Sequence, residues 1–379
     1  MNEYKRLGDY IREVNVRNRD LKVTNLVGLT IEKAFIPSVA NVIGTDLSAY
    51  KVIRKEQFAC SLMQVSRDGK MPIAMFGEDE AIMSPAYPMF EVVDKSELLP
   101  QYLMMWFSRS EFDREASYYA VGGVRGSLTW EDFCNMQLPV PSITRQREIV
   151  AEYETLKRRI QLNEQMIRNL ESTAQTLYRK MFVDGIDKEN LPEGWRMGTI
   201  GDIARVKSGY AFPSEWWQKD GIPVIKINNI HDNTIFRFEC DCVSRDKEDF
   251  VSNYKANKGD VVIALTGNVG KCSIVPEDGY LVNQRVGIFN VDGNKREYLY
   301  LTLFSKDVQN EIQSLGGGSV QINISATDLE AISIILPSEN IFEFFHNKIK
   351  IIFKYINIER QLTKELYKIQ SLLLTKMGT

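Results

Sequence analysis

Two segments of the chain carry an apolar stripe that steps by three and four residues in turn. The first stripe consists of Tyr153, Leu156, Ile160, Ile167, Leu170, Ala174, Leu177 and Met181, with Asn163 as a polar member. The second consists of Phe345, Ile349, Ile352, Ile356, Leu366, Leu373 and Met377, interrupted by Glu359, Thr363 and Gln370. Steps of this kind repeat every seven residues and lie on one face of a continuous helix. The pattern therefore predicts two long helices, each roughly 50 Å in length at 1.5 Å per residue.

A helix with such a stripe buries it against another element, so we expect the two helices to pack on each other. The long stretch of chain between them favours an antiparallel two-helix coiled coil within the chain. Asn163 occupies the stripe position that Glu359 occupies in the second helix. A polar residue there either sets the register of the pair or lies exposed near a frayed part of it.

The second helix also carries apolar residues that lie off its stripe. They are Phe344, Phe353, Leu362, Ile369, Leu372 and Leu374. A two-helix coil cannot cover all of them, so they indicate either a surface for a further partner or packing against the neighbouring lobe.

The segments before the two helices have a different pattern, in which short β-branched or aromatic runs alternate with turn residues. Gly221–Ile227, Gly259–Gly267 and Val286–Val291 read as strands. Helical spacing is found over Pro100–Ser117 and Lys295–Leu315. Each segment is therefore predicted to be a sheet-rich lobe, and the fold class is α+β.

The chain is an internal repeat, because a shift of 196 residues places its second part on its first. The best matches are Gly122–Leu128 with Gly318–Ile324, Leu138–Ser142 with Ile334–Ser338, and Met181 with Met377. Two such units imply a pseudo-twofold arrangement. The predicted divisions are a first lobe over 1–143, a long helix over 144–182, a linker over 183–194, a second lobe over 195–338 and a last helix over 339–379.

The charge balance excludes a simple basic protein that coats DNA. The 379 residues have a formal net charge of -3, and residues 183–338 alone carry 16 basic and 22 acidic side chains. Any contact with nucleic acid must therefore come from the local distribution of charge. No apolar run approaches the roughly 18 residues of a membrane span, and the first residues lack the apolar stretch of a signal peptide. We expect a cytoplasmic protein without a membrane partner.

The residue types that carry chemistry do not form a recognisable catalytic or metal-binding pattern. The five cysteines, Cys60, Cys134, Cys240, Cys242 and Cys272, have neither a disulfide nor a zinc spacing, so we expect mostly buried free thiols. Gly267–Cys272 departs from the phosphate-binding loop spacing and reads as a turn between strands. Neither a cofactor fingerprint nor the Asn-Pro-Pro-Tyr/Phe string of adenine methyltransferases is present. Catalysis, and with it any bound cofactor, is expected to belong to other chains.

The order of lobe, helix, lobe and helix resembles the specificity subunits of type I restriction-modification systems over essentially all 379 residues. The motifs that carry the resemblance are Gly123–Thr129 followed by Leu138–Pro141, Gly318–Ser325 followed by Ile335–Ser338, Lys258–Gly267 and Asn283–Arg285. The first lobe lacks the Gly-Asp and Thr-Gly strings of the second and has Lys55–Phe58 instead. This divergence is expected if the two lobes read different DNA sequences.

The resemblance implies a reader of double-stranded DNA without catalytic activity. Each lobe, as a target-recognition domain, would read one half of an interrupted target, and the helices would fix the gap and dock two methyltransferase subunits. Motor-nuclease subunits would join them in the full restriction enzyme. S-adenosylmethionine, ATP and magnesium would bind to those partners, so this chain would hold no cofactor and no metal.

Arg, Lys, Asn and Gln side chains read bases in the major groove, and any basic or polar donor can contact the phosphates. The candidates in the first lobe are Arg17, Asn18, Arg19, Arg67, Lys70, Tyr87 and Arg125. The candidates in the second lobe are Lys207, Tyr210, Lys226, Asn228, Asn229, Asn268, Lys271, Asn283, Gln284, Arg285, Gln321 and Asn323. Each of them has an alternative as a solvated surface residue or a turn cap. Trp216 and Trp217 could either stack on bases or be buried. For the whole chain, the alternative function is a coiled-coil adaptor that never binds DNA.

Overall fold

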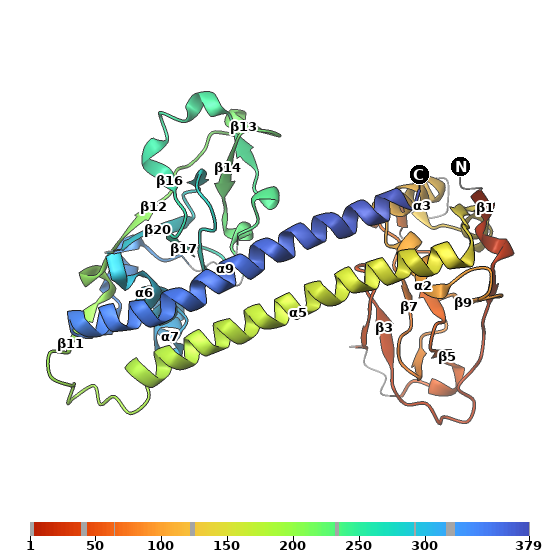
Figure 1. Ribbon diagram of the computed structural model, residues 1–379, viewed down its shortest axis with the longest axis horizontal. Helices are drawn as coiled ribbons and strands as arrows, with labels where there is room; N and C mark the ends of the chain where they lie inside the picture. The colour runs from red at the N-terminus through yellow and green to blue at the C-terminus, as the bar shows by residue number, and fades with distance from the viewer. Residues whose placement is uncertain are drawn as a thin grey trace. The chain divides into compact units, whose positions relative to one another are not determined.

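Both long helices are shared between the two compact units of the molecule. The computed structural model describes residues 4–38, 44–63, 65–121, 126–231, 235–291, 293–315 and 323–378. Unit 1 comprises Met1–Asn163 and Leu362–Thr379, and unit 2 comprises Glu164–Gln361. Helix α5 (Ile143–Phe182) and helix α9 (Glu339–Lys376) each contribute one part to each unit (Figure 1).

The lobe of unit 1 is built on a four-stranded antiparallel sheet in the order β2-β9-β6-β7. These strands are β2 (Ile11–Glu13), β6 (Phe58–Cys60), β7 (Ile73–Met75) and β9 (Met89–Val92). Three further antiparallel pairs are β1 (Tyr4–Arg6) with β10 (Gln137–Pro139), β3 (Val27–Leu29) with β4 (Phe35–Pro37), and β5 (Lys51–Arg54) with β8 (Glu80–Met83). The helices of the lobe are α1 (Val65–Asp68), α2 (Pro100–Phe107), α3 (Ser110–Ala120) and α4 (Trp130–Asn135).

The lobe of unit 2 contains a four-stranded antiparallel sheet in the equivalent order, β12-β20-β17-β18. These strands are β12 (Ala204–Ser208), β17 (Val261–Ala264), β18 (Cys272–Ile274) and β20 (Val286–Val291). A second sheet consists of β13 (Trp217–Gln218), β15 (Cys242–Val243), β14 (Ile222–Ile225), β19 (Tyr280–Val282) and β16 (Lys255–Ala256), in which β14 and β19 are parallel. The remaining elements are the pair β11 (Arg196–Thr199) with β21 (Ser333–Leu336), and helices α6 (Arg296–Leu303), α7 (Lys306–Leu315) and α8 (Ala326–Ala331).

The α+β class predicted from the sequence is confirmed, and the three predicted strands form as β14, β17 and β20. The two runs of helical spacing, however, each divide into two helices. In unit 1 the backbone of Arg109 is extended, and the Ser108 hydroxyl donates to the Met104 carbonyl at 2.8 Å, which ends α2. In unit 2 the Ser305 hydroxyl accepts a hydrogen bond from the Val308 N–H at 3.4 Å and starts α7. A periodic pattern alone does not show such a short break.

Equivalent tyrosines hold the strand that leads into each long helix. The Tyr102 hydroxyl donates to the Pro139 carbonyl at 3.2 Å in unit 1, and the Tyr298 hydroxyl donates to the Ile335 carbonyl in unit 2. Both tyrosines are about 1% exposed. The two contacts are separated by the same 196 residues that relate the sequence motifs.

The core of each unit includes residues from both long helices. In unit 2, Tyr178 and Phe182 of α5 pack with Phe345 and Ile349 of α9 in one buried cluster, and the Phe182 and Phe345 ring centroids are 4.9 Å apart. In unit 1, Ile149 of α5 and Met377, which follows α9, are both part of the lobe core. Each unit therefore completes its core with segments that are distant in the sequence.

The residues of the two predicted stripes are buried or half-buried in the structure. The buried members are Ile160, Asn163, Ala174, Phe345, Ile349, Ile356, Thr363 and Met377, and the half-buried members are Tyr153, Leu156, Ile167, Leu170, Leu177, Met181, Ile352, Glu359, Leu366, Gln370 and Leu373. The exposed alternative for Asn163 is therefore wrong, because its side chain is only 4% exposed. Among the apolar residues off the stripe, Phe353 and Leu374 pack on the unit cores. Phe344, Leu362, Ile369 and Leu372 remain exposed.

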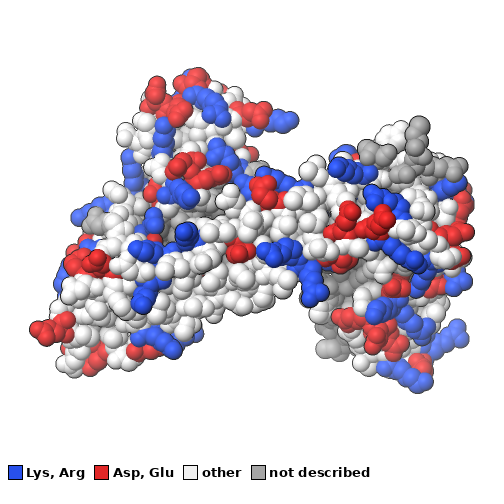
Figure 2. Space-filling view, viewed as in Figure 1, with Lys and Arg blue, Asp and Glu red and all other residues white. Residues whose placement is uncertain are grey.

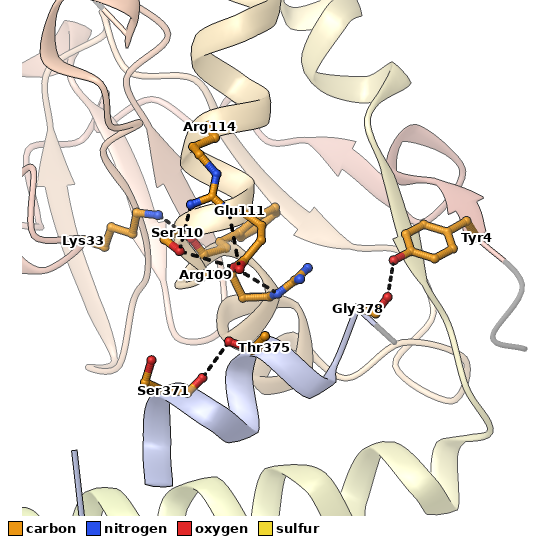
Figure 3. A network of polar contacts seen from close by, with 10 residues as sticks. Tyr4, Lys33, Arg109, Ser110, Glu111, Arg114, Ser371, Thr375 and Gly378 are labelled. Atoms are coloured by element: carbon orange, nitrogen blue, oxygen red, sulfur yellow. Dashed lines mark hydrogen bonds and ion pairs between the residues drawn. The ribbon is translucent and has the colours of Figure 1, made fainter. Parts of the chain in front are cut away.

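The last turn of α9 is fastened to the lobe of unit 1 (Figure 3). The Arg109 guanidinium lies 4.0 Å from the ring centroid of Trp106 and is nearly buried, with 7% exposure. Gly378 approaches this guanidinium so closely that a Cβ atom at that position would collide with it. The Tyr4 hydroxyl donates to the Gly378 carbonyl at 2.9 Å. A stacked arginine and a glycine thus hold the end of the helix in place.

We predict that Ile349→Ala destabilises unit 2, whereas Ile351→Ala, two residues away on the same helix, does not. Ile349 is fully buried and Ile351 is 54% exposed. Loss of buried side-chain volume costs about 2–5 kcal/mol, and an exposed truncation costs about 0.5 kcal/mol or less. Hydrogen exchange of α6 and of the first half of α9 measures the difference. Equal protection in the two variants would contradict this account of the helix face.

Candidate nucleic-acid interface

Two turns of the second lobe lie side by side at one edge of the sheet β12-β20-β17-β18. The first joins β17 to β18 and the second joins β19 to β20. The Leu265 N–H donates to the Arg285 carbonyl at 2.9 Å, which ties the two turns together. Asn323 pairs with Thr266 through an isolated β-bridge and adds a third segment to the same edge.

These turns present five polar side chains of the kinds that read bases and contact phosphates. The five are Asn268, Lys271, Gln284, Arg285 and Asn323, and all of them are exposed. Within the part of the chain that the structure describes, none of the five side chains forms a hydrogen bond or ion pair with the protein. Sequence analysis named all five, and the structure brings them to one edge of one lobe. Their unused donors and acceptors remain available to a ligand.

Tyr210 joins this edge to a cluster of aromatic rings. Its N–H donates to the Val282 carbonyl at 2.8 Å, and its carbonyl accepts from the Gln284 N–H at 2.9 Å. Its ring belongs to the aromatic cluster of the lobe, which we define as Tyr210, Phe212, Trp216, Trp217, Phe250 and Tyr254. The two tryptophans are half-buried in this cluster.

Two other candidates of the second lobe are already engaged within it. Asn229 is 6% exposed; its side-chain oxygen accepts from the Lys226 N–H at 2.8 Å, and its amide donates to the Glu239 carbonyl at 2.9 Å. Lys226 pairs with Asp241 at 2.6 Å and lies 3.7 Å from the ring centroid of Trp217. The turn-capping alternative therefore describes Asn229, whereas Asn228 is exposed.

Lys207 and Asn283 are also used inside the fold. The Lys207 ammonium donates to the Asn253 carbonyl at 2.9 Å and lies 4.9 Å from the ring centroid of Tyr254. The Asn283 side chain accepts a hydrogen bond from the Arg285 N–H at 3.3 Å and so shapes the turn that presents Arg285.

In the first lobe, three neighbouring candidates have different environments. Asn18 is 1% exposed and its amide donates to the Val23 carbonyl at 2.9 Å, so its side chain stabilises its own loop. Arg17 donates to the Ala49 carbonyl at 2.6 Å. Arg19 is exposed and has no protein partner among the described residues. Of the three, Arg19 offers a free guanidinium.

Arg67, Lys70 and Tyr87 lie in segments of the first lobe that match the two turns of the second, and Arg67 is part of helix α1. Arg67 and Lys70 lie between β6 and β7, the strands that take the places of β17 and β18 in the sheet order, and Tyr87 lies just before β9. Lys70 is exposed, Arg67 pairs with the adjacent Asp68 at 2.6 Å, and Tyr87 is half-buried. Arg125 and Gln321 lie outside the residues that the structure describes.

The cysteines have no pattern of a reactive or metal-bound site. All five are free, with Cys60, Cys240 and Cys272 buried. Burial raises the pKa of Cys240 to about 12 and raises the pKa of Cys60 and Cys272 even further. Thiols with such values stay protonated at neutral pH, and a protonated thiol is neither a nucleophile nor a metal ligand. The expectation of mostly buried free thiols is confirmed, and Gly267–Cys272 forms the predicted turn between strands.

Positive and negative side chains alternate over the surface seen in Figure 2, and no extended patch of Lys and Arg is visible on this face. The unpaired cations at the turns therefore gain importance, since Lys226 already pairs with a carboxylate and Lys207 already donates to a carbonyl.

The sequence of this chain is similar to those of known proteins. The family described as type I restriction modification DNA specificity domain matches residues 192–368. The MjaVIII specificity subunit of Methanocaldococcus jannaschii is 26% identical over 64% of this chain, and the match spans 62% of that relative, less than two thirds of its length. The HindI specificity subunit of Haemophilus influenzae is 21% identical over 98% of this chain and 97% of that relative.

A solved structure agrees in fold. The S subunit of a type I restriction-modification system from M. genitalium has a TM-score of 0.59, covers 100% of this chain and 96% of its own, and is 13% identical. The matched class is thus a two-lobed α+β protein with long helices. Residues 192–368 of this chain match the DNA specificity domain family of type I restriction-modification systems, and the chain is similar to specificity subunits of such systems.

We predict that Asn229→Ala lowers the stability of the second lobe, whereas Asn228→Ala next to it leaves stability unchanged. Removing the buried amide leaves the Lys226 N–H and the Glu239 carbonyl without their partner, which costs about 1–3 kcal/mol. The exposed neighbour is expected to change stability by about 0.5 kcal/mol or less. Urea denaturation followed by tryptophan fluorescence measures both variants. Equal midpoints would show that Asn229 does not cap this turn.

Proposed function

We propose that each lobe reads one half of a bipartite, interrupted target in double-stranded DNA. The observation that carries this proposal is that two lobes with the same order of sheet strands place polar and basic side chains on equivalent loops. A common scaffold with different loop residues suits two readers of different sequences. The family match supports this role, and it lends no support to an adaptor that never touches DNA.

We infer that the two units arose by internal duplication and are related by a pseudo-twofold axis. Helices α4 and α8 support the duplication, since they are offset by 196 residues and have equivalent N-caps. Thr129 accepts from the Asp132 N–H at 3.0 Å, and Ser325 accepts from the Asp328 N–H at 3.1 Å. A twofold relation between readers would match the two halves of the target.

We propose that α5 and α9 form the antiparallel coiled coil predicted from the stripes. The ion pair between Glu171 and Arg360, with atoms 2.6 Å apart, supports this pairing within unit 2. In this proposal the helices set the gap between the two half-sites and dock two methyltransferase subunits. The exposed apolar residues Phe344, Leu362, Ile369 and Leu372 of α9 are candidate contacts for one of these subunits.

In the full enzyme, motor-nuclease subunits would join the methyltransferases, and S-adenosylmethionine, ATP and magnesium would bind to those partners. This chain would contribute recognition without catalysis. The target sequence depends on the exact shape of the turns and on the bases they meet.

Sequencing of DNA methylation in cells with and without this gene tests the proposed function. The methyltransferase gene of the same system must be present in both strains. Loss of adenine methylation at one bipartite motif on deletion is the expected result, and it also supplies the target. An unchanged pattern of methylation in a strain with active methyltransferase would contradict the proposal.

We predict that Arg285→Ala weakens binding of the assembled methyltransferase to its target by about 1–3 kcal/mol, the cost of removing one arginine contact to a base. Arg285 is exposed and has no side-chain partner among the described residues. Arg196→Ala is the matched control, because that arginine pairs with Asp202 at 3.2 Å, away from the turns. Fluorescence anisotropy with target and scrambled duplexes measures the effect. A loss equal to that of the control would remove Arg285 from the reading surface.

A further inference from the structure

Phe250 is a large apolar residue that projects from the second lobe, and sequence analysis did not single it out. It is 66% exposed, whereas the next residue, Val251, is fully buried. Its ring packs edge to face on Trp216 and Tyr210, with centroid distances of 5.7 and 5.8 Å and interplanar angles of 85° and 76°. The ring is therefore held from below by two other rings while its outer part faces solvent.

Phe250 lies close to the proposed reading surface. Its neighbour Tyr210 accepts a hydrogen bond at its carbonyl from the Gln284 N–H at 2.9 Å. Gln284 and Arg285 occupy the turn whose exposed side chains are free to contact DNA. Tyr210 thus contacts Phe250 through its ring and this turn through its backbone.

The charges around Phe250 are mostly neutralised by local pairs. Asp246 pairs with Lys247 at 2.8 Å, and Glu248 pairs with Lys255 at 2.8 Å. Asp249 remains an exposed carboxylate without a side-chain partner among the described residues. The approach of DNA to this tip is therefore opposed by Asp249 and by Glu215, an exposed carboxylate next to Trp216 that also has no side-chain partner among the described residues.

We propose that Phe250 acts as an apolar wedge that enters the base stack when the second lobe binds its half-site. This inference rests on the proposed function, because it assumes that the second lobe binds duplex DNA. Apolar side chains inserted between base pairs unstack them and kink the duplex. A ring that is already fixed by Trp216 and Tyr210 loses little conformational freedom on insertion.

The wedge would add specificity that hydrogen bonds do not supply. Pyrimidine–purine steps unstack more easily than others, so an inserted ring favours target sequences that have such a step at the right place. Gln284 and Arg285 would read base edges, and Phe250 would select for deformability at a neighbouring step.

The test uses the assembled methyltransferase and duplexes that carry its mapped target. 2-Aminopurine replaces one base at a time, at every position except the methylated adenine, because a methyltransferase extrudes that base itself. Insertion of the wedge unstacks a neighbouring 2-aminopurine and raises its fluorescence. Phe250→Ala is compared with Phe250→Leu, which keeps an apolar wedge, and with Met197→Ala, which removes a 43% exposed apolar residue elsewhere in the same lobe.

We expect one or two adjacent positions to brighten with the wild-type complex, with Phe250→Leu and with Met197→Ala, and to stay dark with Phe250→Ala. Specific binding by the wild-type complex without brightening at any position would overturn the wedge and leave the proposed function intact. Brightening that persists in Phe250→Ala would do the same. Phe250→Ala could instead release a methyltransferase subunit while the 2-aminopurine fluorescence remained as bright as with the wild-type complex. Phe250 would then be a contact to another protein, and the wedge would be wrong. Absence of sequence-specific binding by the wild-type complex would refute the proposed function itself.

Discussion

Burial of the apolar stripes of α5 and α9 is the interaction on which both units depend. Neither lobe has a core that is complete without the long helices, because Met377 fills part of the first core and Tyr178 and Phe345 fill part of the second. In the first core, Met377 meets residues such as Leu7, from which most of the chain separates it. The lobe of unit 1 can therefore reach its final stability only after the last helical turns have been made, which couples the folding of the chain's beginning to that of its end.

Burial fixes the parts of each lobe that join it to its long helix, whereas the proposed reading surface is exposed. The strands and tyrosines that join each lobe to its helix are fixed by buried contacts such as those of Tyr102 and Tyr298. The turns at the edge of the sheet are held through their backbone, and their exposed side chains can change without loss of core volume. In the proposed function, a new DNA preference could evolve at positions such as Lys271 or Arg285 while the stripes and the capped helices stay the same. This explains how the two lobes share an order of strands but differ in their loop residues.

Much of the fold follows from periodicity, which is a local property of the sequence. The stripe residues, the strands β14, β17 and β20, and the 196-residue offset all depend on spacing that can be read along the chain. The break at Arg109 depends on the extended backbone of that residue, and the break at Ser305 depends on a single hydrogen bond; no periodic pattern reveals either of them. The exposed side chains at the turns could be predicted from residue type. The same criterion also selected Asn18 and Asn229, which are buried. An asparagine that caps a buried turn and an asparagine that reads adenine cannot be distinguished in sequence. Phe250 gave no signal, since an exposed ring is recognisable only once Trp216 and Tyr210 are seen beneath it.

Electrostatics also limits how this protein could bind DNA in its proposed function. Affinity for DNA of any sequence grows with the number of phosphates that free cations neutralise. The lobes carry more acidic than basic residues, and several basic groups at the second lobe, such as Lys226 and Lys255, already pair with carboxylates. The chain alone would therefore have few unpaired cations that could contact phosphates. Contacts to bases and to base stacks would have to supply a larger share of its binding energy. In an assembly, basic surfaces of the partner subunits would hold the duplex, and this chain would be left to choose the sequence. With few phosphate contacts of its own, this chain would bind only weakly to DNA that lacks the target sequence.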